Sequence, residues 1–171
     1  MPAPAARILG FDLSLRATGF GCIAVAGSRL TAEAWGVVRA PASWPHSRCL
    51  ANLQEVATRL LGEGAVPEAV AIEGIFHARN VRTAITLGEV RGVVLAVCAA
   101  AGIPVFEYAP REVKQAVVGW GAASKEQVAK MVGSVLGLAE PPTTDAADAL
   151  GVAICHAHQR TGLGRSPRRT L

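Results

Sequence analysis

One stretch limits the possible folds and functions of this chain more than any other. It is a short apolar strand that ends on a carboxylate, Ile8-Leu9-Gly10-Phe11-Asp12. Aspartate is a poor strand former, and a buried charge is costly unless it is paired or binds a metal. A single acid of this kind has a plain explanation as a turn or capping residue. The pattern recurs, however, because a second apolar strand ends on Glu73 and an acidic pair, Asp145 and Asp148, follows later. If the two strands are neighbours, the sequence predicts four carboxylates at one edge of a sheet.

Length and composition indicate one folded domain. The chain has 171 residues, of which 51% are hydrophobic and 18% charged, and this suits a single domain with a sizeable core. We expect the domain over residues 1–158 and a flexible basic tail over residues 159–171, which are rich in Gly, Pro and Arg. The net charge of +4 and the pI of about 9.2 are compatible with a polyanionic partner.

Cysteine usage and hydropathy point to the cytoplasm. No signal peptide is visible, and the longest apolar run, residues 92–106, is interrupted by Gly and Pro and is too short to cross a membrane. We therefore expect a cytoplasmic protein with no membrane partner. The widely spaced cysteines sit in apolar contexts and are predicted to be reduced core residues in a reducing compartment: Cys22, Cys49, Cys98 and Cys155.

Hydrophobic periodicity predicts an α/β fold. Three antiparallel strands open the chain, near residues 8–12, 20–25 and 30–38, and are followed by a helix over 48–61. The rest is predicted as a strand ending at Glu73, a helix over 83–101, a strand over 103–108, and helices beginning at Pro110, Ser124 and Asp145. We expect a five-stranded mixed sheet with helices on both faces.

The four acids suggest a site for divalent cations. Asp145 and Asp148 are three residues apart, so a helix places them on one face. Four carboxylates crowded in a cleft repel one another, and a pair of Mg²⁺ ions relieves that repulsion. Two such ions activate a water and stabilise the leaving oxygen of a phosphodiester. The competing interpretation, that Asp145 is only a favourable first-turn acid, leaves Asp148 unexplained.

A set of spaced motifs resembles the RuvC family of Holliday-junction resolvases, within the ribonuclease H-like superfamily. The stretches that carry the resemblance run in order from residue 8 to about 158: residues 8–12, 16–21, 71–80, 87–92, 104–108, 111–119, 125–128 and 145–150. The resemblance implies a ribonuclease H-like fold and a structure-specific endonuclease that resolves four-way DNA junctions by paired symmetric nicks. It also implies a homodimer, with a branch-migration helicase as a further candidate partner.

The resemblance also assigns roles residue by residue. It implies that Asp12, Glu73, Asp145 and Asp148 bind two Mg²⁺ ions per active site, with Mn²⁺ as a substitute. Lys114 and Lys125 fall on basic positions near the scissile backbone, and Phe76 falls on an aromatic that acts on bases at the junction centre. From the residues alone, Phe76 is either a ring that stacks on an unpaired base or a residue that folds into the core.

One motif departs from the family. Typical bacterial members have Asp-Pro-Gly at the first acid, whereas this chain has Asp12-Leu13-Ser14-Leu15, a form closer to divergent or phage-borne relatives. We expect the carboxylate to keep its role while the geometry and substrate preference of the loop change. Ser14 is a candidate contact to a phosphate or to a metal-bound water.

Other polar and aromatic residues lie near these motifs. The loop after Glu73, where phosphates would pass, is flanked by Arg79, Arg82 and Arg91, and Asn80 either caps the next helix or touches DNA. Trp120 is predicted to pack between its flanking glycines, and His156 and His158 to lie at a helix end or surface. The tail arginines would add only non-specific attraction to phosphates.

Three alternatives accompany the resolvase interpretation. A ribonuclease H-like nuclease acting on other branched DNA would use the same four acids, and a non-catalytic junction-binding module would need none of them. An actin-like ATPase would require a Gly-rich phosphate hairpin and a duplicated domain, and this chain has Leu13-Ser14-Leu15 and is too short. For the dimer, the Ala- and Gly-rich helix predicted over 83–101 is the candidate interface.

Overall fold

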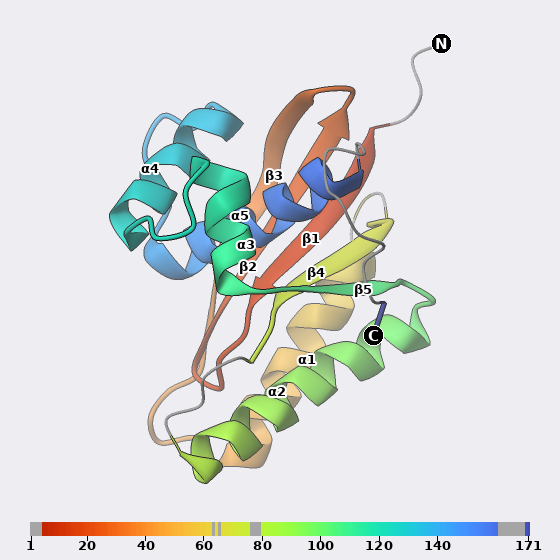
Figure 1. Ribbon diagram of the computed structural model, residues 1–171. Coiled ribbons are helices and arrows are strands. Elements are labelled where there is room, and N and C mark those ends of the chain that lie inside the picture. Colours follow the sequence, from red (N-terminus) through yellow and green to blue (C-terminus); the bar gives the residue numbers. More distant parts are fainter. Residues whose placement is uncertain (1–4, 63, 65, 76–79, 161–169) are drawn as a thin grey trace.

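The structure is a computed structural model that describes residues 5–62, 64, 66–75, 80–160 and 170–171. Helices and strands follow one another along the chain in the predicted order (Figure 1). In these residues the elements are β1 (Ala6–Asp12), β2 (Ala17–Ala26), β3 (Arg29–Arg39), α1 (His46–Gly62), β4 (Ala69–Glu73), α2 (Val81–Ala100), β5 (Val105–Tyr108), α3 (Pro110–Val118), α4 (Lys125–Leu136) and α5 (Thr144–His158).

The strands form a mixed sheet in the order β3-β2-β1-β4-β5. β1 pairs with β2, and β2 with β3, in antiparallel fashion, as the closely spaced strands of the sequence predict. β4 and β5 then add to the other edge of β1 as parallel strands. The parallel pairing brings the carboxyl ends of β1 and β4, which carry Asp12 and Glu73, to the same edge of the sheet.

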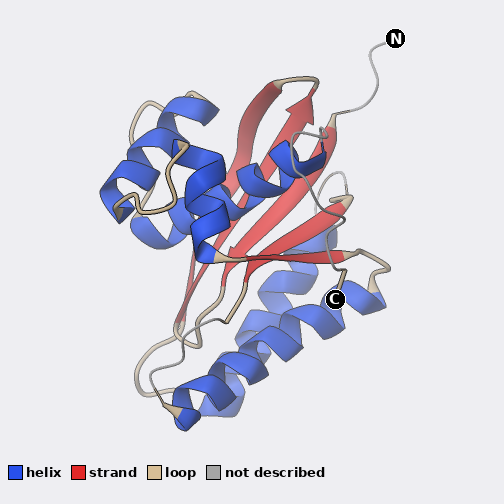
Figure 2. Cartoon of the chain, in the orientation of Figure 1, coloured by secondary structure: helices blue, strands red, loops and turns tan. Residues whose placement is uncertain are grey.

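Helices cover both faces of this sheet (Figure 2). Leu9 and Phe11 of β1 pack into the layer of α1 and α2, whereas Ile8 packs into the layer of α3, α4 and α5. The alternation follows from the two-residue period of a strand. By the same period, Asp12 projects into the layer of α5, and so does Glu73, because Ala71 belongs to that core.

Two strand glycines set the position of α5. An added Cβ at Gly10 would lie 2.1 Å from the carbonyl oxygen of Ala149, and one at Gly19 would lie 2.0 Å from the carbonyl oxygen of Asp145. No side chain fits in either place, so glycine permits the α5 backbone to lie directly on the sheet. The small residues Ala146, Ala149 and Ala153 of α5 are all buried at this contact.

The helix caps follow the sequence signals. Ser124 caps α4 with Gln127 completing the capping box, and the Asn80 side chain caps α2 by accepting from the Thr83 amide at 2.9 Å. Asn80 is thus a helix cap, and its contact with DNA stays a prediction. The four cysteines all lie in the described part of the chain, are buried, and are reduced thiols as predicted.

Two features differ from the sequence-based expectation. At the end of the predicted flexible tail, Thr170 bridges to Phe106 and the Leu171 amide donates to the Val105 carbonyl at 3.0 Å, so these last residues run along β5. Helix α2 begins before the apolar run used for prediction. Over Val81–Ala100 it is, among the described residues, the one helix long and apolar enough to cross a membrane by length and composition alone. Its residues Val90, Val94 and Cys98 pack in the core.

Candidate active site

Two neighbouring strand ends form the base of the site. Phe11 of β1 lies beside Ile72 of β4 in the sheet, so the next residues along each strand, Asp12 and Glu73, end the two strands together. Both acids line one depression at this edge, together with Arg91 of α2 and Pro110 at the start of α3. The sequence prediction that these two acids meet at one edge is confirmed.

Helix α5 brings the acidic pair to the same edge. Gly19 pairs with Asp12 across β1 and β2, and the backbone of Asp145 rests against Gly19. Asp148 lies one turn further along α5. Negative charge on Asp148 and Asp145 raises the pKa of Asp12, which places all three carboxylates within electrostatic reach of one another.

Burial and like charges perturb the strand acids. Desolvation, followed by the charges of Asp148 and Glu73, raises the pKa of Asp12 to about 7. Desolvation and the charge of Asp148 likewise raise the pKa of Glu73. A perturbed carboxylate beside other acids in a cleft is a common property of functional sites.

Two lysines offset part of this negative charge. The Nζ of Lys125, at the start of α4, lies 3.0 Å from Oδ2 of Asp148, and this hydrogen bond raises the pKa of Lys125. Lys125 and Lys114 each lower the pKa of Glu73, so both ammonium groups act on the site. Because the Lys125 side chain is 64% exposed, its head group is accessible to a ligand.

The donor set suits a hard divalent cation. Carboxylate oxygens are the ligands that Mg²⁺ prefers, and a cation would relieve the repulsion that raises the pKa of Asp12. As they stand, no three His, Cys, Asp or Glu side chains of the described residues are gathered closely enough to hold a metal. In this arrangement the ammonium of Lys125 supplies positive charge at Asp148. A cation held by three or more of these carboxylates would need them closer together than they stand.

Ser14 has a structural partner in the loop that departs from the family motif. Its hydroxyl accepts from the Ala17 amide at 3.0 Å, and its own amide donates to the Thr18 hydroxyl at 3.1 Å. The Thr18 hydroxyl in turn donates to the Ser14 carbonyl. These bonds close the turn between β1 and β2 without Pro or Gly. Contact of Ser14 with a phosphate stays a prediction.

Some predicted contacts lie outside the described residues or outside the site. Phe76 and Arg79 belong to the undescribed residues 76–79, and the tail arginines to residues 161–169. Asn80 is engaged as a helix cap. Arg91, predicted to flank the loop after Glu73, lines the depression and pairs with Glu107. The structure adds Gly10 and Gly19, for which glycine inside a strand pattern was the available signal.

Two predictions about single residues were wrong. Trp120, expected to pack, is 59% exposed. His156, expected at a helix end or surface, is buried, and its Nδ1 lies 2.7 Å from the Tyr108 hydroxyl. Desolvation, followed by the charge of Arg160, lowers the pKa of His156 to about 4, so the ring is neutral at physiological pH.

Comparison with known proteins then decides the family. The model of the family described as crossover junction endodeoxyribonuclease RuvC matches residues 8–156. The chain belongs to the RuvC family. It is 49% identical over 157 residues to RuvC of Heliobacterium modesticaldum, covering 90% of this chain and 95% of the relative. RuvC of Syntrophomonas wolfei is 48% identical over 153 residues, covering 89% of this chain and 88% of the relative.

A solved structure agrees with this assignment. The chain is similar to Thermus thermophilus RuvC in complex with a Holliday junction substrate, with a TM-score of 0.88 and 34% identity over 97% of this chain and 99% of that one. The ribonuclease H-like fold expected from the resemblance is therefore confirmed. RuvC enzymes are metal-dependent crossover junction endodeoxyribonucleases, and the acidic site of this chain fits that chemistry.

Proposed function

We propose that this RuvC-family chain resolves four-way DNA junctions by hydrolysing one phosphodiester in each of two opposing strands. The observation that supports this most directly is the concentration of negative charge at Asp12, whose pKa is raised to about 7 by burial and by Asp148 and Glu73. Binding DNA requires no acids, whereas phosphodiester hydrolysis by bound cations requires such a cluster.

In the proposed site, Asp12, Glu73, Asp145 and Asp148 bind two Mg²⁺ ions, for which Mn²⁺ can substitute. When bound, the ions lower the pKa of a water and stabilise charge on the leaving oxygen. Asp12 would bind a cation in its deprotonated form, so cation binding would be coupled to the loss of the proton that burial and the charges of Asp148 and Glu73 favour. Lys125 and Lys114 bind the phosphates that flank the scissile bond.

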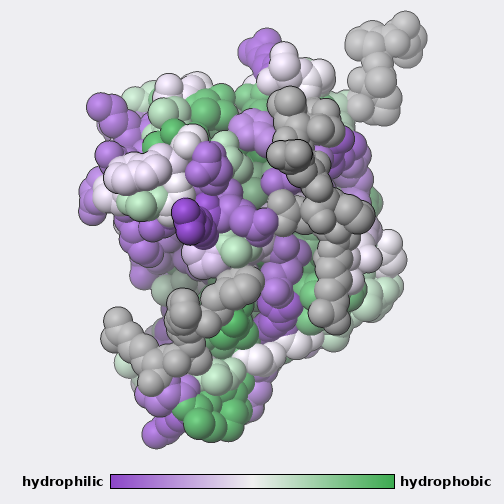
Figure 3. Space-filling view, viewed as in Figure 1, coloured by the Kyte–Doolittle hydropathy of each residue, from purple (hydrophilic) through white to green (hydrophobic). Residues whose placement is uncertain are grey.

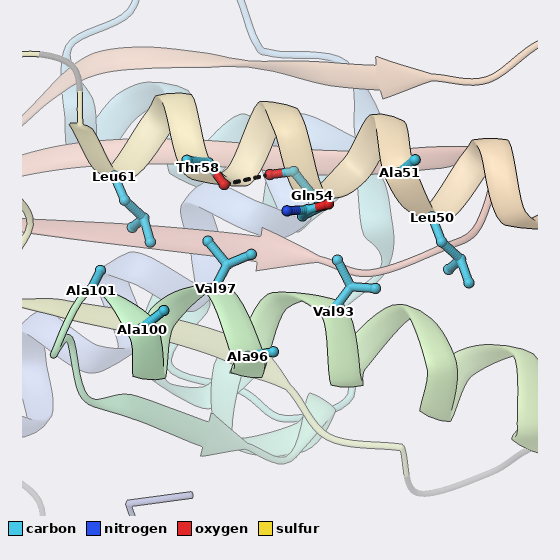
Figure 4. A pocket seen from close by; sticks show the side chains of 10 residues that line it. All are labelled: Leu50, Ala51, Gln54, Thr58, Leu61, Val93, Ala96, Val97, Ala100 and Ala101. Carbon is cyan, nitrogen blue, oxygen red and sulfur yellow. Dashed lines mark hydrogen bonds between the residues drawn. The ribbon is translucent and has the colours of Figure 1, made fainter.

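We further propose that the enzyme is a homodimer formed through α1 and α2. Apolar and small side chains from the two helices face one another along an open groove (Figure 4). The hydrophobic surface continues over the start of α2 (Figure 3, green, bottom), where Val81 is 76% exposed and Ile85 59% exposed. A second copy covering this face would remove an apolar patch that monomers rarely expose, and two sites related by two-fold symmetry match a four-way junction.

The proposed dimer interface accounts for the apolar surface of α2, so no membrane partner is proposed. Reduced, buried cysteines and a DNA substrate fit work in the cytoplasm. A branch-migration helicase is a candidate partner of the dimer.

A cleavage assay with matched substrates tests the proposal. The protein is incubated with a synthetic four-way junction, a three-way flap and a linear duplex of the same sequence, with Mg²⁺, Mn²⁺ or EDTA. We expect symmetric nicks in the junction alone, lost in EDTA and in Asp12→Asn, which still binds the junction. Glu140→Gln, an exposed change in the loop between α4 and α5, is the control and should cleave normally.

Other results of this cleavage assay would favour one of the alternative functions. Efficient nicking of the flap would favour a nuclease for other branched DNA. Junction binding without divalent-dependent nicking would favour a non-catalytic module, and full activity of Asp12→Asn would refute the metal-site assignment.

A further inference from the structure

The loop between two helices of the acidic site carries an exposed indole to which the proposed function gives no role. Trp120 is 59% exposed, and it occupies the loop that joins α3 to α4. A ring of this size offers a large apolar surface and one N–H donor to a ligand. Mobility of the loop does not explain the exposure, because several contacts fix its backbone.

These contacts begin at the end of α3. Gly119 ends the helix in the left-handed conformation, with φ of 82°, and its carbonyl accepts from Gln115 Nε2 at 2.6 Å. The Trp120 carbonyl accepts from the Ala123 amide at 3.3 Å, and Ala123 is buried. The loop therefore presents the indole from a fixed backbone, which reduces the entropy lost when a ligand binds.

The loop folds back toward the acidic depression. An added Cβ on Gly121 would lie 2.6 Å from Cγ and 3.3 Å from the carbonyl oxygen of Arg111, so the loop lies against the first turn of α3. Pro110, the preceding residue, lines the depression with Asp12 and Glu73. The start of α3 is thus one connection between the Trp120 loop and the site. The second is the C-terminal end of the loop, which leads through Ser124 to Lys125, and Lys125 is bonded to Asp148.

Basic residues lie on the elements that flank this loop. Arg111 is exposed beneath the loop, Lys125 follows it, and Lys114 projects from α3 toward Glu73. The surface over α3 and α4 is mainly hydrophilic, with paler patches among the purple ones (Figure 3). An aromatic ring among cations matches a polyanion that also offers apolar rings, which is the chemistry of DNA sugars and bases.

We propose that Trp120 binds the DNA strand as it leaves the acidic depression on the α4 side, packing its indole against a deoxyribose or an exposed base edge. Lys114 and Lys125 hold the adjacent phosphates while Trp120 fixes the lateral position of the strand over the carboxylates. This inference rests on the proposed function, because it assumes that DNA lies over the acidic depression.

Junction binding in EDTA, where no strand is cut, tests the proposal. Trp120→Ala should weaken binding of a fluorescein-labelled four-way junction by about tenfold, within the range of aromatic–nucleic acid contacts. The dependence of log Kd on log salt should keep its slope, because an indole neutralises no phosphate. Lys114→Met should lower that slope by about 0.9. Trp35→Ala removes the other largely exposed indole, 42% exposed on β3, and should bind like wild type.

A direct readout uses the fluorescence of the indole itself. In the Trp35→Phe/Trp44→Phe variant, Trp120 is the single tryptophan of the chain, and junction DNA should quench its emission at saturation. Unchanged emission together with unchanged affinity of Trp120→Ala would overturn the inference while leaving junction cleavage by the wild type intact. Failure of the wild type to bind or cut junctions would instead overturn the proposed function.

Discussion

The ammonium of Lys125 lies 3.0 Å from the carboxylate of Asp148, at the sheet edge that carries Asp12 and Glu73. Lys125 lowers the pKa of both Asp12 and Glu73, so it acts as an internal counter-charge for the site. A divalent cation that binds Asp148 must compete with this ammonium, and a DNA phosphate is an alternative partner for it. Cation binding and DNA binding at this site are therefore expected to assist each other.

Lys125→Met should raise the affinity for Mn²⁺ in the absence of DNA, because the competing ammonium is gone. A few-fold increase is expected for an exposed pair of this kind, measured by electron paramagnetic resonance of free Mn²⁺. Cleavage should fall, since a phosphate contact is lost. Lys130→Met, an exposed change on the same helix, is the control and should alter neither quantity. An unchanged or lower Mn²⁺ affinity in Lys125→Met would show that the ammonium does not compete.

The raised pKa of Asp12 predicts how stability depends on pH without metal. The group titrates near 3.8 when unfolded and near 7 when folded, so between these values the folded state holds more protons. Its contribution to the free energy of unfolding therefore falls as pH rises from about 4 to about 7. Asp12→Asn should remove this fall and stabilise the protein at pH 8 in EDTA, on the order of 2 kcal/mol.

Urea unfolding of wild type and Asp12→Asn at pH 5 and pH 8 measures this effect. Comparison of the two proteins is needed because His156, with a pKa lowered to about 4 in the fold, contributes in the opposite direction between about pH 4 and 6.5. The difference between variant and wild type isolates Asp12. An equal difference at both pH values would mean that neither burial nor the neighbouring acids raise the pKa of Asp12 in the folded protein.

The acids were predictable from sequence because strand ends and turn signals are local. Asp12 and Glu73 each follow an apolar run. Such runs indicate buried strands, which favours the parallel pairing of β1 and β4 that the structure shows. The two-residue period then puts both side chains on the face of α5. Most of the site thus follows from local pattern plus one assumption about strand order.

Tertiary packing decided what the sequence pattern could not. His156 reads as a residue near a helix end, yet α5 is enclosed by the sheet and by α3 and α4, so the ring is buried and bonded to Tyr108. Trp120 reads as a packing residue, but the loop turns its indole outward. The closeness of α5 to the sheet depends on Gly10 and Gly19, whose role appears only when the opposing backbone is known.

Gly19→Ala should therefore damage both stability and the site. The added methyl group would lie 2.0 Å from the Asp145 carbonyl oxygen, so α5 must move and carry Asp145 and Asp148 away from Asp12. We expect destabilisation of about 3 kcal/mol or more, as for overpacked cores, measured by urea unfolding. Gly62→Ala adds a methyl group with nothing within 4 Å and should change stability little. A Gly19→Ala protein as stable as wild type would show that the α5 backbone does not pack directly against β2 at this position.

A substitution in the proposed dimer interface should abolish dimerisation without unfolding the monomer. Ala96 is exposed on α2 and lines the groove with Val93 and Val97, so Ala96→Glu places a charge at the centre of the interface without entering the core. Desolvation of an unpaired carboxylate costs several kcal/mol, and the dimer should dissociate at micromolar concentration in sedimentation velocity. The thermal midpoint of the monomer should stay within a few degrees of wild type.

Ser134→Glu, an equally exposed change on α4 across the sheet, is the control and should remain dimeric. If Ala96→Glu also sediments as a dimer, the two-fold contact uses a different surface, and the spacing of the two acidic sites must be derived from that surface instead.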